Sequence, residues 1–231
     1  MDYTSNFSTW WSLAVLAAAI VVVYLVVSFF ARRRAKALTD AAAQLGFTYN
    51  GDKWLDQNRA PQLETWLFLN EKYHARYENI ILGNRDGLSC NFFDYSFTMG
   101  KSSISQTVAT FTQDVWIPPF AVAPQDILHK VSDAVLHKAI QFESDPDFSK
   151  RYRLVSSDEE KARALFTPEL LSFIASLDPS KKWHVEGAGT MLVIYRRGKT
   201  VRPEEFAAFV EQTTQMAKTF LSCSGLKKIS V

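Results

Sequence analysis

The sequence predicts an α+β fold: an N-terminal transmembrane helix followed by an antiparallel β-meander and a second half of mixed helices and a β-hairpin. Three observations lead to this class. One apolar run near the N-terminus is long enough to cross a bilayer. A central segment alternates apolar and polar residues between turn signals, and the later segments show helical periodicity with capping residues.

The apolar run extends from Trp10 to Ala31 and contains 22 consecutive residues without a charge. As a helix it reaches roughly 33 Å, enough for a hydrocarbon core of about 30 Å. A buried core helix would be shorter and less uniform. A cleaved signal peptide would need basic residues before the apolar run, where Asp2 is the only charged side chain. We therefore expect an uncleaved transmembrane helix over 10–31.

Basic residues flank this run on one side only. They are Arg32, Arg33, Arg34 and Lys36, whereas residues 1–9 contain no Lys or Arg. The positive-inside rule then predicts a short extracytoplasmic tail over 1–9 and a soluble region in the cytoplasm. We expect the basic cluster at one membrane interface, and Trp10 and Trp11 in the aromatic belt of the other. The cluster could also hold anionic head groups, although a topology signal suffices to explain it.

Positive charge is confined to the anchor. The chain carries a formal net charge of +2, but residues 37–231 contain 22 basic and 23 acidic residues. A near-neutral soluble region offers no basic surface for nucleic acid, so nucleic-acid binding is not expected. The 2 cysteines, Cys90 and Cys223, are far apart and form neither a disulfide framework nor a metal-binding motif.

The basic cluster runs into an Ala-rich segment, and we expect a basic juxtamembrane helix over 32–46 that Gly46 ends. Its apolar face would dock on the domain and consists of Leu38, Ala41, Ala42 and Leu45. Residues 47–231 then form the soluble α+β domain. Within that domain, 47–75 favours short helices or an apolar loop packed on the sheet.

An antiparallel meander is predicted over 76–115. Its three strands span Tyr77–Leu82, Leu88–Thr98 and Ser103–Val115, with turns at 84–87 and 99–102. Phe93, Tyr95 and Phe97 share one face of the second strand, which favours a core position over a stacking platform. The segment Trp116–Phe120, which contains two prolines, predicts the end of the third strand. With Pro124 it marks either a crossover within one domain or a split into two halves near 116–124.

The second half is predicted to alternate short helices and strands. The expected elements are a helix over 125–138, a short strand near 139–142, a strand over 151–155, a helix over 158–165, a helix from Thr167-Pro168, a hairpin of Trp183–Glu186 and Met191–Tyr195, and a last helix over 203–221. Ser157 to Glu160 has the pattern of a capping box and would start the 158–165 helix. Gly187-Ala188-Gly189 would form the hairpin turn.

No motif for a cofactor, a metal or a known reaction is present. The sequence lacks a P-loop and a nucleophile elbow, and Gly187-x-Gly189 does not open a helix. The four histidines are His74, His129, His137 and His184, and no two of them have metal-ligand spacing. Cys90 lies in a predicted strand, which favours a small buried apolar role over a nucleophilic one. We therefore expect no cofactor.

Three carboxylates are the remaining candidates for chemistry. Asp145 and Asp147 flank Pro146 in an acidic segment, where a turn or helix start is favoured over a metal or acid–base site. Asp94 lies between aromatic residues and would be costly to bury without a partner. We expect it to pair with Arg76 or Arg85 across the hairpin.

Three motifs together resemble an uncharacterised bacterial family with one N-terminal transmembrane helix and a soluble α+β domain. They are Phe93-Asp94-Tyr95-Ser96-Phe97, Asp145-Pro146-Asp147-Phe148-Ser149 with Tyr152-Arg153-Leu154, and Leu165-Phe166-Thr167-Pro168. The resemblance covers most of 40–220 and implies an origin in a bacterial inner membrane. It implies no catalytic residue.

These observations favour a membrane-tethered cytoplasmic binding or scaffolding module that works without catalysis. Its expected partners are the lipid bilayer and another membrane or cytoplasmic protein. One alternative is an enzyme with an unrecognised active site that uses at least two of Asp94, Asp145, Asp147 and Cys90. The other is a sensor of anionic lipids that uses the juxtamembrane basic cluster.

Overall fold

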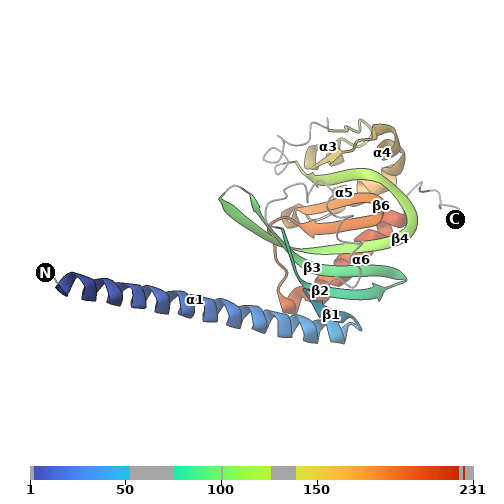
Figure 1. Cartoon of the computed structure of the whole chain (residues 1–231). Helices are drawn as coiled ribbons and strands as arrows, with labels where there is room; N and C mark the ends of the chain where they lie inside the picture. The colour runs from blue at the N-terminus through green and yellow to red at the C-terminus, as the bar shows by residue number, and fades with distance from the viewer. Residues whose placement is uncertain (1–2, 53–74, 100, 126–138, 224–225, 227–231) are drawn as a thin grey trace.

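The computed structural model describes residues 3–52, 75–99, 101–125, 139–223 and 226. Helix α1 (Tyr3–Gln44) is continuous through the apolar run and the basic cluster, so the expected juxtamembrane helix continues directly from the apolar helix. Figure 1 shows its N-terminal part projecting freely from the rest of the protein. From Trp10 onward α1 is long and apolar enough to span a membrane, and none of its most apolar window is buried.

The C-terminal end of α1 docks on the domain, as the sequence predicts. Leu38 and Ala42 are buried in the main core. Gly46 adopts a positive φ of 74°, and the amide of Phe47 donates to the carbonyl of Ala42 at 2.9 Å. This left-handed residue ends the helix and turns the chain into the sheet.

In the described residues, six antiparallel strands form one open sheet. They are β1 (Thr48–Gly51), β2 (Arg76–Arg85), β3 (Leu88–Met99), β4 (Ser102–Pro124), β5 (Tyr152–Val155) and β6 (Trp183–Arg196). The order is β1-β2-β3-β4-β5, and β6 pairs with β4. The meander is confirmed, with positive φ at Asp86 and Gly87 in the first turn. Residues 48–51 form β1 and not a helix or loop, while 53–74 lie outside the described residues.

The predicted end of the third strand near Trp116 is wrong, because β4 continues to Pro124. Its first half pairs with β3 and its last residues pair with β5. The register with β6 shifts between Thr112 and Ile117 and again before Phe120. Prolines cannot donate to a ladder, so they are tolerated where pairing is interrupted. Figure 1 shows β4 bending back around β6 at this point.

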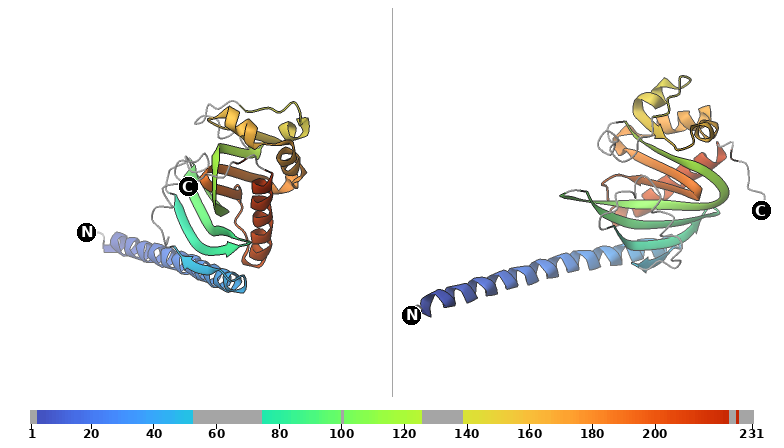
Figure 2. Two further views of the ribbon diagram at one scale, coloured as in Figure 1. Left: turned by 90° about the vertical axis from the view of Figure 1, so that its right-hand side faces the viewer. Right: turned by 45° about the horizontal axis from the view of Figure 1, so that its top comes forward.

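The predicted division of 183–195 into two strands is wrong, because Trp183–Arg196 forms one continuous strand, β6, that bends sharply and pairs with β4 on both sides of the bend. The rings of His184 and Tyr195 stack at 4.8 Å, and the Arg196 guanidinium lies 5.2 Å from the Trp183 ring centre. Both contacts require the two arms of β6 to lie against each other. The bend of β6 therefore nests inside the bend of β4 (Figures 1 and 2).

Short helices complete the fold. They are α3 (Pro146–Arg151), α4 (Glu159–Leu165), α5 (Pro168–Ser176), η2 (Pro179–Lys181), η3 (Pro203–Glu205) and α6 (Phe206–Ser222). Asp158 caps α4 by accepting from the amide of Lys161 at 3.1 Å, so the predicted cap at Ser157 is wrong by one residue. The expected strand near 139–142 is a single bridge between Ile140 and Leu154. The helix expected over 125–138 lies outside the described residues, except for Gln125.

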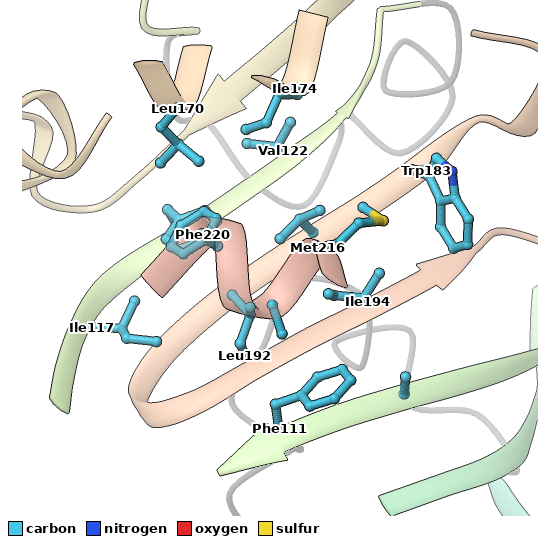
Figure 3. Close-up of a cluster of buried hydrophobic side chains, with 14 of the residues drawn as sticks. Phe111, Ile117, Val122, Leu170, Ile174, Trp183, Leu192, Ile194, Met216 and Phe220 are labelled. Atoms are coloured by element: carbon cyan, nitrogen blue, oxygen red, sulfur yellow. The ribbon is translucent and has the colours of Figure 1, made fainter. Parts of the chain in front are cut away.

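Apolar side chains cover both faces of the sheet. Figure 3 shows one face, where strand and helix residues meet in the main core: Phe111, Ile117, Leu192, Ile194, Leu170, Ile174, Met216 and Phe220. The other face carries a second cluster that includes Phe93, Tyr95 and Phe97, each at most 1% exposed. The core position predicted for these three aromatic residues is confirmed.

Candidate functional site

A bulge in β2 places a polar side chain where α1 meets the sheet. The pairing of β2 with β3 shifts between Glu78 and Ile81, and Asn79 adopts a positive φ of 54°. Asparagine tolerates this left-handed conformation better than most residues. The Asn79 side chain donates from Nδ2 to Asp94 Oδ2 at 2.9 Å and accepts from Tyr49 Oη at 2.8 Å.

Asp94 is the centre of this polar network. Arg34 donates to both of its oxygens, from Nε at 2.9 Å and from Nη2 at 3.0 Å. Thr107 donates from Oγ1 at 2.7 Å and in turn accepts from the amide of Val201 at 2.8 Å. The Asp94 side chain is 12% exposed and that of Arg34 25%, so the ion pair is largely shielded from water. A bidentate Arg–carboxylate pair of this kind restricts the relative orientation of the two side chains as well as neutralising their charges.

The partner expected for Asp94 from the sequence is wrong. Arg85 pairs with Glu211 at 3.3 Å, and Arg76 lies opposite Ser96 in the β2–β3 register. Arg34 comes from α1, 60 residues away in the sequence. The ion pair therefore links the juxtamembrane helix directly to the sheet.

The remaining basic and aromatic residues of the anchor are exposed. Arg32, Arg33 and Lys36 are exposed to solvent, and Trp10 and Trp11 are 72% and 61% exposed. Their location at the two membrane interfaces stays a prediction.

A cleft of about 460 Å³ lies between α1 and the β1–β2–β3 side of the sheet. Polar and charged residues predominate in its lining by number, although the larger share of the lining surface is apolar. The lining comprises Ala31, Arg32, Arg34, Ala35, Tyr49, Gly51, Asp52, Glu78, Asn79, Asp94, Tyr95, Ser96, Ser105 and Thr200. Burial, followed by the carboxylates of Asp52 and Asp94, raises the pKa of Tyr49 above its ordinary value. The phenol is therefore neutral at physiological pH, and it donates its single proton to Asn79 Oδ1.

The other candidate residues have local structural contacts. Asp145 caps α3 by accepting from the amide of Phe148 at 2.9 Å, which confirms the predicted helix start. Asp147 is 75% exposed and lies 3.9 Å from Lys150. Cys90 is fully buried, and burial raises the pKa of its thiol to about 11. Among the contacts given for the described residues, none joins these three side chains to Asp94.

Two further features bear on catalysis and metal binding. His184 is buried and packs on Tyr195, whereas His74, His129 and His137 lie outside the described residues. Within the described ranges, no group of three His, Cys, Asp or Glu side chains could hold a metal ion.

Sequence reasoning missed Tyr49, Asn79 and Thr107 as members of the site. Each is ordinary in its local pattern, and only pairing of distant segments brings them to Asp94. The position of Asp94 between aromatic neighbours was the one sequence feature that indicated this site, because a carboxylate in such surroundings needs hydrogen-bonding partners.

Comparison with known proteins shows a shared fold and no family. No family model matches the chain, and no curated protein matches it. The crystal structure of the mycobacterial trehalose monomycolate transport factor A, TtfA, aligns with a TM-score of 0.55. The identity is 11%, over 85% of this chain and 98% of that one. A bacterial protein of solved structure therefore shares this architecture, and the likeness concerns the fold alone.

Proposed function

We propose that this chain is a single-pass, membrane-tethered module that faces the cytoplasm of a bacterial cell and binds a ligand or partner protein without catalysis. The proposal rests mainly on the contact between anchor and domain, which we call the joint, where Arg34 on α1 donates two hydrogen bonds to Asp94 on β3. Among the described residues, none of the most apolar window of α1 is buried, while the C-terminal end of α1 is part of the core. Such a joint sets the orientation of the domain relative to the bilayer.

Two observations support binding as the role. The cleft lies beside this joint, with a volume in the range of ligand pockets. The fold is also shared with a protein described as a transport factor, which fits a non-catalytic role at a membrane by analogy of fold.

The test is site-specific photo-crosslinking of the full-length protein in native membranes. A photoreactive residue at Ser105 or Thr200, both exposed in the cleft, should give a discrete adduct. The matched control is Lys150, which is exposed on α3 and outside the cleft lining. Equal labelling from all three positions, or none from the cleft, would contradict the proposal. A reaction catalysed by the purified protein and abolished by one cleft substitution would favour the enzymatic alternative.

A further inference from the structure

The cleft lies at the depth of lipid head groups if α1 spans the bilayer. The apolar run ends at Ala31, and the first charged residue after it is Arg32. Both residues line the cleft. The boundary between hydrocarbon and head groups falls at the first charges that flank a span. One wall of the cleft is therefore the first helical turn outside the hydrocarbon.

The cleft also extends along the sheet toward the membrane. The Arg34–Asp94 ion pair is part of its lining. Ser96 and Ser105 are paired in register. They lie on the same face of the sheet as Asp94, two residues along each strand toward the β3–β4 turn. That turn projects on the side of the domain from which the free part of α1 leaves (Figures 1 and 2). A lipid head group can therefore reach the lining from the bilayer surface.

The lining carries two positive and three negative side chains, and the two signs lie on opposite walls. Arg34 and Asp94 neutralise each other, which leaves Arg32 on the helix wall and Asp52 and Glu78 on the sheet wall. Arg32 and Glu78 enter no ion pair within the part of the chain that the structure describes. Arg76 is exposed at the margin, opposite Ser96 in the register. A purely anionic head group would meet two carboxylates, whereas a zwitterion would find a partner for each of its charges.

We propose that this cleft binds the head group of a zwitterionic aminophospholipid. Arg32 holds the phosphate near the membrane, and Asp52 and Glu78 receive the ammonium. Tyr49, Ser105 and Thr200 supply neutral hydrogen-bonding groups. The inference rests on the proposed binding role and names its ligand class.

The experiment uses the full-length protein in nanodiscs that contain equal amounts of phosphatidylethanolamine and phosphatidylglycerol with identical acyl chains. After transfer to detergent, native mass spectrometry counts the lipids retained per protein. We expect one retained phosphatidylethanolamine, preferred by about tenfold, the scale of one charge-assisted contact. Glu78→Lys should remove the preference by reversing a charge in the lining, and Ser105→Trp should lower retention by filling the cleft. Glu143→Lys, an exposed residue outside the lining, is the matched control and should change nothing.

Several results would overturn the inference. One is equal retention of the two lipids, and another is unchanged retention in both Glu78→Lys and Ser105→Trp when their thermal unfolding matches wild type. Glycerophosphoethanolamine at millimolar concentration should displace the lipid. If this soluble compound binds while the lipid is never retained, the ligand is a solute and the lipid assignment is wrong. If lipid retention fails but Ser105 still crosslinks a partner, the binding role stands and only its ligand class is rejected.

Discussion

Asp94 concentrates the polar contacts that join the anchor to the sheet. It accepts four hydrogen bonds, two from Arg34 and one each from Asn79 and Thr107. A shielded carboxylate is stable only when such donors replace its hydration, and removing its charge leaves Arg34 without a counter-ion.

Asp94→Asn should therefore lower the free energy of unfolding by about 2–3 kcal/mol. The measurement is urea unfolding of the detergent-solubilised protein, followed by tryptophan fluorescence. Asp147→Asn is the matched control, since its side chain is 75% exposed and should change stability by less than about 0.5 kcal/mol. Equal effects of the two substitutions would show that the Arg34–Asp94 pair contributes no more than a surface charge.

Cys90 offers a second test at this scale. Burial raises the pKa of its thiol from 9.0 to about 11. At pH 8 only about one molecule in a thousand carries the thiolate, which is the reactive form. N-Ethylmaleimide should therefore label Cys223, which is partly exposed, and spare Cys90 until the protein is unfolded. Mass spectrometry of the labelled peptides checks this, and labelling of native Cys90 at a comparable rate would contradict it.

The same shift makes a prediction for stability against pH. The folded state holds the Cys90 proton more tightly than the unfolded state does. The contribution of the protonated thiol to the free energy of unfolding is therefore complete below pH 9 and is lost as the pH rises toward 11. Comparing urea midpoints of wild type and Cys90→Ala at pH 8 and pH 10.5 isolates this effect. The wild type should lose more stability than the variant over that interval, and equal losses would contradict the shift.

Among the elements, the nested bends of β4 and β6 depend on a close approach at Gly187. A Cβ there would lie 2.2 Å from Phe120 Cε1 and 2.8 Å from Ile117 Cγ2. Both neighbours are buried, so neither can move aside freely. Gly189 differs, because a Cβ would meet nothing within 4 Å and only its positive φ of 60° disfavours a side chain.

Gly187→Ala should therefore cost about 2–3 kcal/mol through overpacking. Gly189→Ala should cost about 1 kcal/mol through backbone strain. Thermal unfolding of the two variants side by side separates the mechanisms. If Gly189→Ala were the more damaging, the steric account of the bend would be wrong.

At the scale of the whole molecule, the anchor and the domain share one helix. Because α1 runs unbroken from the apolar span into the core, the membrane side on which the domain lies follows from the orientation of α1. A C-terminal green fluorescent protein fusion should fluoresce and an alkaline phosphatase fusion should be inactive, as the flanking basic residues predict. Phosphatase activity would place the domain outside and overturn the cytoplasmic assignment.

Local signals account for what could be predicted. The apolar run over 10–31, the turn over 84–87 and the helices expected from Thr167-Pro168 and over 203–221 are each recognisable within one continuous segment, where propensity and periodicity act. The start of α4 was missed by one residue, because Ser157 and Asp158 are both good caps. The strand end near Trp116 was missed because prolines interrupt pairing without ending a strand whose neighbours hold it on both sides.

The site itself is non-local. Arg34 belongs to a basic cluster of the kind that sets membrane topology. Nothing in the neighbouring sequence distinguishes it from Arg32 or Arg33. Its partner Asp94 is 60 residues away in the sequence. The two side chains come into contact only when α1 packs on the domain through Leu38 and Ala42. Long-range ion pairs and clefts depend on how elements pack, which single-sequence patterns do not encode. The residues along the chain were thus enough to predict an α+β protein with one apolar helix of membrane-spanning length, whereas only the packing of that helix on the sheet created the cleft on which the proposed function depends.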